Sequence, residues 1–127
     1  MNKINMDVKD TYNKFLKQTK VGGKAVMKHR IDNMCEEDKI ICDTYCPNKN
    51  VIAYEECKQY NWKIIFFEDY SLLLITNNTP KKDNYNLNYI VSTAISGVLP
   101  ENKTLVRRLP CKKDDKTIFL MKIEDIN

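Results

Sequence analysis

Long hydrophobic runs are missing from this chain, which excludes a membrane-spanning helix of the usual length. A helix that crosses a bilayer needs roughly 18 or more consecutive apolar residues, and no stretch of the sequence approaches that length. The start of the chain, Met1 to Asn5, also lacks the apolar segment of a secretory signal peptide. We therefore expect an intracellular, cytoplasmic protein.

Glycine and proline are scarce, with three glycines and four prolines among 127 residues. No linker or low-complexity tract stands out, so residues 1–127 are predicted to form one domain. The apolar fraction of 43% is ordinary for a globular protein and allows a core without disulfides. The net charge of +4 favours acidic partner surfaces but is far from the extreme of nucleic-acid-binding chains.

Histidine is rarer still, and the spacings of known catalytic motifs are missing. The single histidine, His29, has no obvious partner in the sequence, and a lone histidine is more often structural or solvated than catalytic. The sequence contains no nucleophile elbow, P-loop or dinucleotide-binding glycine motif. These absences predict a protein that is not an enzyme and needs no cofactor.

Cysteine occurs in an odd number, five, without the close pairs that are typical of zinc sites. Cys35, Cys42, Cys46 and Cys57 are separated by six, three and ten residues, which fits no compact tetrahedral site. An odd count without a secretory signal also disfavours a disulfide framework. We favour buried or idle thiols and expect no bound metal.

Two short apolar runs, Ile64–Phe67 and Leu72–Ile75, predict the centre of the fold. Runs this apolar are typical of strands that are buried on both faces. The four residues between them can close a hairpin but cannot form a crossover helix. We therefore expect a central antiparallel hairpin that is covered by helices on both sides.

The remaining segments are assigned from their apolar periodicity and from helix start and stop signals. The predicted fold class is α+β: a single domain with a central mixed five-stranded sheet sandwiched between helices. The expected helices are Asp7–Gln18, Val51–Tyr60, Asn86–Leu99 and Asp114–Ile123, and the other expected strands are Ala25–Ile31, Lys39–Cys42 and Thr104–Leu109.

The order of these segments and several local strings follow the pattern of a known family. The strings are Val8 with Asp10, Lys20–Lys24, Trp62–Tyr70, Thr79-Pro80, and Leu87 with Tyr89 and Ser92. On these residues the chain resembles the actin-depolymerising factor homology family, which includes cofilin. The resemblance covers nearly the whole chain. It implies a gelsolin-like fold and an actin-binding protein that regulates filament turnover.

The resemblance also implies a contact face for actin. Such a face combines the amino-terminal residues, a loop after a proline and the polar side of the expected helix Asn86–Leu99. Binding would bury a helix face with a polar rim, and the few positive charges would steer the approach to an acidic surface. The implied contact residues are Asn2, Lys3, Ile4, Asn5, Met6, Lys81, Lys82, Asn84, Asn86, Tyr89, Ser92, Thr93 and Ser96.

Departures from the family pattern bear on which form of actin is bound. Asn84 and Asn86 stand where relatives usually carry basic residues, and the turn Glu68–Ser71 has no lysine or arginine. We therefore expect a monomeric cytoskeletal protein that prefers monomeric actin, with weak filament binding or severing. Phosphoinositide head groups are a further candidate partner.

Two alternatives stay open. The first is a relative that binds actin-related proteins at branch points instead of actin. The second is a small basic nucleic-acid or ribosome-associated protein that uses pairs such as Arg107-Arg108 on phosphates. Phe66 and Phe67 lie inside a wholly apolar run and offer no exposed stacking platform, which favours a protein partner over a nucleic acid.

Overall fold

The computed structural model describes residues 10–21, 24–59, 61–77, 92–107, 111–113 and 116–126. Within them, the longest helix is α2 (Glu36–Tyr45), which follows the short 3-10 helix η1 (Ile31–Asn33). Residues 10–16 and 92–96 are also helical. The strands are β1 (Lys20–Val21), β2 (Lys24–Ala25), β3 (Met27–His29), β4 (Val51–Cys57), β5 (Trp62–Phe67), β6 (Ser71–Asn77), β7 (Lys103–Arg107), β8 (Cys111–Lys113) and β9 (Lys116–Asp125).

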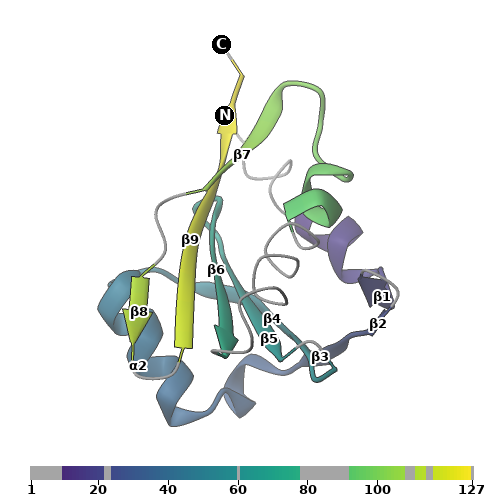
Figure 1. The fold of residues 1–127 in the computed structure, drawn as a ribbon. Helices are drawn as coiled ribbons and strands as arrows, with labels where there is room; N and C mark the ends of the chain where they lie inside the picture. Colours follow the sequence, from purple (N-terminus) through teal and green to yellow (C-terminus); the bar gives the residue numbers. More distant parts are fainter. Residues whose placement is uncertain are drawn as a thin grey trace.

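One large sheet organises the described part of the chain, and all of its pairings are antiparallel (Figure 1). Six strands follow one another in the order β3-β4-β5-β6-β9-β7, and β8 pairs with β9. Strands β8 and β7 pair with successive parts of the long strand β9, beginning at Lys116 and ending at Asp125. Strands β1 and β2 form a separate two-stranded pair.

This topology overturns the predicted fold class. A mixed five-stranded sheet sandwiched between helices is wrong, because every strand of the large sheet runs antiparallel to its neighbours and six strands lie in its main order. The described chain is α+β, with few and short helices. The gelsolin-like architecture implied by the family resemblance is corrected by the same observation.

The central hairpin is confirmed. β5 and β6 pair antiparallel, with Ile64 opposite Leu74 and Phe66 opposite Leu72. Both runs, Ile64–Phe67 and Leu72–Ile75, are buried along their whole length. Because side chains alternate across a strand, these residues divide between the two faces of the sheet and serve two separate cores.

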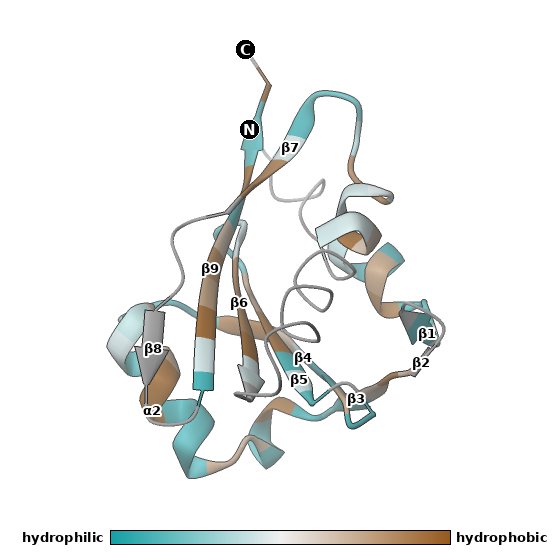
Figure 2. Ribbon diagram, viewed as in Figure 1, coloured by the Kyte–Doolittle hydropathy of each residue, from teal (hydrophilic) through white to brown (hydrophobic). Residues whose placement is uncertain are grey.

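The two cores define the two faces of the sheet. The first face carries Trp62, Ile64 and Phe66 and packs against Phe15 and Ile95 from the two short helical segments. The second face carries residues such as Ile65, Phe67, Leu73 and Ile75, and α2 covers it with Ile41, Cys42 and Cys46. Figure 2 shows hydrophobic residues in the middle of β9 and in α2. Each fully buried side chain of this size contributes about 1.5–3 kcal/mol.

Lys39–Cys42, expected as a strand, lies inside α2, so this prediction is wrong. The acidic first turn of α2 is favourable at a helix N-terminus. Its buried residues Asp38, Ile41 and Cys42 recur at helical spacing, which places them on the side that faces the sheet. A segment of four residues is too short to distinguish a strand from one helical turn.

Two expected helices are strands. Val51–Tyr60 contains β4, and Asp114–Ile123 contains most of β9. Both segments hold good helix formers, but each lies beside a strand of the central hairpin: β4 pairs with β5, and β9 pairs with β6. Hydrogen bonding to a fully buried hairpin outweighs local helix propensity, which is a weak preference of less than about 1 kcal/mol per residue.

The other predicted segments are recovered in part. Residues 10–16 and 92–96 are helical within the expected helices Asp7–Gln18 and Asn86–Leu99, whose remaining parts lie partly outside the described residues. The expected strand Ala25–Ile31 contains β3 and ends in η1, and Thr104–Leu109 overlaps β7. Among the described residues, no helix is both long and apolar enough to cross a membrane.

Candidate functional site

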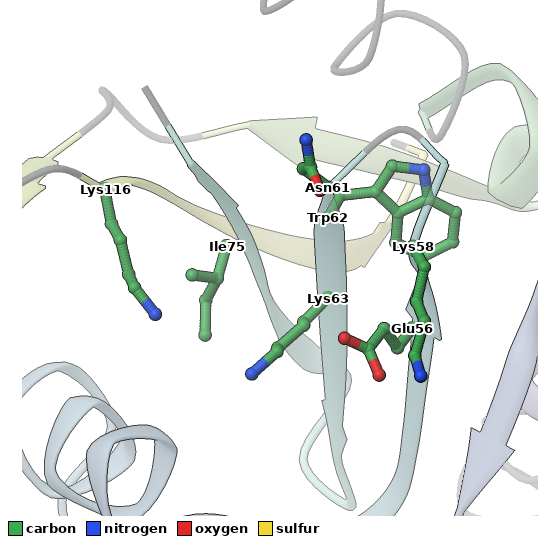
Figure 3. Close-up of a pocket in the computed structure, with 7 residues that line it drawn as sticks. All are labelled: Glu56, Lys58, Asn61, Trp62, Lys63, Ile75 and Lys116. Atoms are coloured by element: carbon green, nitrogen blue, oxygen red, sulfur yellow. The ribbon is translucent and has the colours of Figure 1, made fainter. Parts of the chain in front are cut away.

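A pocket of about 280 Å³ opens where β4 ends and β5 begins (Figure 3). Most of its lining side chains project from the second face of the sheet, the face that α2 covers. Three of the lining residues are lysines and only one is acidic. The pocket is lined by Glu56, Lys58, Asn61, Trp62, Lys63, Ile75 and Lys116.

Strand pairing brings the lysines together. Lys63 on β5 lies opposite Ile75 on β6, and Ile75 lies opposite Ile118 on β9. Lys116 lies two residues before Ile118 and therefore points to the same face. Figure 3 shows Lys63 and Lys116 extending on either side of Ile75. Lys58 completes the set from the turn after β4.

Asn61 shapes the entry of the chain into β5. Its φ of 56° lies in the left-handed region, which asparagine adopts more readily than most residues. This conformation ends the turn between β4 and β5 immediately before Trp62. The turn therefore places Asn61 and Lys58 at the same pocket.

Lys63 is held by a buried carboxylate from α2. Its Nζ donates to Oδ2 of Asp38 over 3.1 Å, and the Tyr54 hydroxyl donates to the same oxygen over 2.8 Å. Burial alone would raise the pKa of Asp38, but hydrogen bonds from Tyr54, Cys35 and Lys63 outweigh it and hold the pKa below its usual value. Burial would lower the pKa of Lys63, yet Asp38 raises it on balance. Both groups are therefore charged at neutral pH.

Lys116 is held differently. Its Nζ lies 3.0 Å from Oε1 of Glu37, the neighbour of Asp38 in the first turn of α2. The Lys116 side chain is only 12% exposed, whereas that of Glu37 is 55% exposed. A largely enclosed ammonium group thus has a partner that reaches into solvent.

The single acidic residue of the pocket is already paired. Glu56 Oε1 lies 2.9 Å from His29 Nε2, and the His29 ring packs against Tyr54 with ring centroids 5.2 Å apart. Lys58, in contrast, is exposed and makes no ion pair with any residue that the structure describes. The pocket therefore contains three ammonium groups in different settings. Lys58 has no ion pair among the described residues, Lys116 is paired with the half-exposed Glu37, and Lys63 is paired with the buried Asp38.

This arrangement is suited to holding negative charge. Ammonium groups bind phosphate and carboxylate oxygens through charge-assisted hydrogen bonds, which are stronger than neutral ones. The side chains of Lys63 and Lys116 are only 25% and 12% exposed, which reduces the screening by water that weakens such contacts at an open surface.

The sequence-predicted actin-contact residues are described only in part. Asn2 to Met6 and the residues Lys81, Lys82, Asn84, Asn86 and Tyr89 lie outside the described residues. Thr93 and Ser96 are exposed, and Ser92 is half-buried with its hydroxyl 4.0 Å from the Met121 sulfur. These three residues lie on the short helix 92–96, away from the residues that line the lysine pocket.

The lysines of the pocket were not recognised in the sequence. Lys63 interrupts an otherwise apolar strand between Trp62 and Ile64, which is the one local signal that could have singled it out. Lys58 and Lys116 stand in ordinary polar surroundings along the chain. The turn between β4 and β5 brings Lys58 near Lys63, and the pairing of β5, β6 and β9 brings Lys116 near it.

The cysteines are distributed over both sides of the sheet. Cys42 of α2 and Cys46, the residue that follows this helix, lie in the core of the second face, and Cys57 lies in the core of the first face. The sheet therefore separates Cys57 from the other two, and no metal-binding cluster occurs in the described ranges. The absence of zinc stays a prediction for the whole chain.

Comparisons with protein-family models, with curated proteins and with solved structures find no match to this chain.

Proposed function

We propose that this protein binds a small ligand that carries phosphate or carboxylate groups, in the pocket lined by Lys58, Lys63 and Lys116. One observation carries the proposal: three lysines converge on a single pocket whose only carboxylate, Glu56, is already paired with His29. Lys58 adds a positive charge with no ion pair among the described residues.

The size of the pocket limits the ligand. Pockets that bind small molecules usually measure about 300–1,000 Å³. At about 280 Å³ this pocket is slightly smaller than that range, which suits a compact anion or the anionic head of a larger molecule. The net charge of +4 supports the approach of such a ligand.

The test is calorimetric titration at low salt with inorganic pyrophosphate, citrate and a soluble inositol phosphate. Binding is expected for at least one of them. Lys58→Gln and Lys116→Gln should each weaken that binding about five- to tenfold, because each removes one charge-assisted contact worth about 1–1.4 kcal/mol. Raising the salt concentration should weaken it further.

Lys122→Gln is the matched control. Lys122 lies on β9 and points to the same face as Lys116, but it is exposed and six residues further along the strand. At about 3.3 Å per residue, this places it about 20 Å away from the pocket. The control loses the same charge and should bind like the parent. Equal weakening in all three variants, or no binding of any anion by the parent, would contradict the proposed function.

The cofilin-type function predicted from the sequence stays a second proposal, with less support than anion binding. The gelsolin-like fold that accompanied it is corrected by the antiparallel sheet, and most of its contact residues lie outside the described residues. Phosphoinositide head groups, the other partner expected from the sequence, are chemically compatible with a lysine pocket, which is why an inositol phosphate belongs in the titration. Co-sedimentation with actin filaments, beside a monomer-binding assay, tests the actin proposal itself.

A further inference from the structure

The two enclosed lysines of the pocket are neutralised by neighbouring residues of α2 in unequal ways. Asp38 is completely buried and accepts hydrogen bonds from Lys63 and Tyr54 through one oxygen. Moving it would leave a partly buried ammonium group and a buried hydroxyl without their acceptor, so Asp38 is fixed. Within the described part of the chain Glu37 makes one ion pair, with Lys116, and more than half of its side chain is exposed.

Exchange at Lys116 is therefore inexpensive. When the Glu37 side chain rotates away, its carboxylate, whose side chain is already 55% exposed, is readily solvated by water. Lys116 itself is only 12% exposed and cannot be solvated to the same extent, so it needs a replacement anion. An anionic ligand in the pocket supplies that replacement.

We infer that Glu37 is an internal competitor, which occupies Lys116 in the unbound protein and leaves it when the ligand binds. This inference rests on the proposed function and deepens it, because it assigns a residue outside the pocket lining the role of setting affinity. The Glu37 carboxylate stands in for the anionic group of the ligand. Glu37 thus acts on binding through Lys116, without contact to the ligand.

The experiment compares Glu37→Gln with the parent by calorimetric titration with inorganic pyrophosphate and with citrate. Removal of the competing carboxylate should tighten binding of the anion at least fivefold. Glu36→Gln is the matched control: Glu36 is the adjacent residue of the same helical turn, is exposed, and makes no ion pair within the described part of the chain. It loses the same charge and should tighten binding less than twofold.

A double-substitution cycle shows whether the effect passes through Lys116. The gain in affinity from Glu37→Gln should vanish when Lys116→Gln is also present, because the ammonium group for which Glu37 and the ligand compete is then missing. A gain that persists without Lys116 would overturn the inference and indicate a general charge effect.

The outcomes separate the two proposals. If the parent binds an anion and Glu37→Gln binds it no more tightly than Glu36→Gln does, the competitor role is wrong while the proposed function stands. If neither the parent nor Glu37→Gln binds inorganic pyrophosphate, citrate or the soluble inositol phosphate, the proposed function is wrong and the competitor role falls with it. Thermal unfolding of each variant without ligand verifies that it is folded.

Discussion

Each face of the large sheet buries one carboxyl group completely, and the two groups behave in opposite ways. On the second face, Asp38 accepts hydrogen bonds from Tyr54 and Lys63. Those contacts hold its pKa low in spite of burial. On the first face, neither oxygen of Glu55 has a hydrogen-bond partner among the residues that the structure describes, and burial raises its pKa to about 7. The presence of donors, more than burial itself, decides whether a carboxyl group inside this protein is ionised.

The first face also buries a second polar group that lacks a hydrogen-bond partner. This group is the indole N–H of Trp62, which has no acceptor among the described residues. Trp62 belongs to the same core as Cys57, and Cys57 follows Glu55 by two residues on β4. Unpartnered buried polar groups each cost about 1–3 kcal/mol. The two faces therefore predict different responses to substitution and to pH.

The largest expected effect follows from removing the partnered carboxyl group. Asp38→Ala should lower the free energy of unfolding by about 3 kcal/mol at pH 7, because Lys63 and Tyr54 lose their shared acceptor. Urea denaturation measures this. Asp43→Ala, an exposed position on the same helix, is the control and should change stability by less than about 0.5 kcal/mol. Equal losses of stability in Asp38→Ala and Asp43→Ala would contradict the prediction that the hydrogen bonds of Asp38 stabilise the second face.

Substitution of Glu55 should change the free energy of unfolding by a smaller amount and in the opposite direction. Because the folded-state pKa of Glu55 is raised from 4.5 to about 7, its protonated form is favoured in the folded protein. Stability from this group is fully present below about pH 4.5 and is lost as pH rises through 7. Glu55→Gln should therefore raise the free energy of unfolding by about 2 kcal/mol at pH 8 and by much less at pH 4.5.

Chemical denaturation at a series of pH values tests this sign. The stability of the parent should fall between pH 4.5 and 8, and Glu55→Gln should lack most of that slope. Glu36→Gln, at an exposed position, should retain the slope of the parent. Equal slopes for the parent and Glu55→Gln between pH 4.5 and 8 would mean that the pKa of Glu55 is not raised in the folded protein.

The smallest expected effect is a change in the pKa of Glu55 when the positive charge of Lys28 is removed. Lys28 lies opposite Glu55 in the pairing of β3 with β4, and its positive charge lowers the pKa of that carboxyl group. Lys28 is exposed, so water screens much of its influence. Lys28→Gln should raise the pKa of Glu55 by a fraction of a unit, as measured by carbon NMR of the carboxyl group. A shift as large as that caused by burial would show that Lys28 contributes more than its exposure suggests.

The central hairpin could be predicted from the sequence because burial on both faces leaves a continuous apolar run in each strand. The neighbouring strands β4 and β9 could not be predicted in the same way. β4 alternates polar and apolar residues irregularly around a bulge between Val51 and Ala53. β9 mixes lysines with helix-forming residues. In both, pairing with the hairpin outweighs a local preference that the sequence does display.

The pocket was beyond prediction for a related reason. Lys58, Lys63 and Lys116 have no shared motif, and Lys116 meets the other two only through pairing across β5, β6 and β9. That pairing register depends on which residues of distant segments are buried. Without the strand assignment of β9, nothing places Lys116 beside the hairpin.

The position of β9 between β6 and the pair β7 and β8 has a consequence for how the binding site comes into being. Strands β4, β5 and β6 are joined by short turns, so they can pair early from local contacts. β9 joins β6 across a long stretch of chain, with Ser71 opposite Lys122, and such a closure is slow. Because Lys116 arrives with β9, the pocket is complete only once β9 has paired with β6. A nascent chain could therefore pair β5 with β6 before the pocket exists.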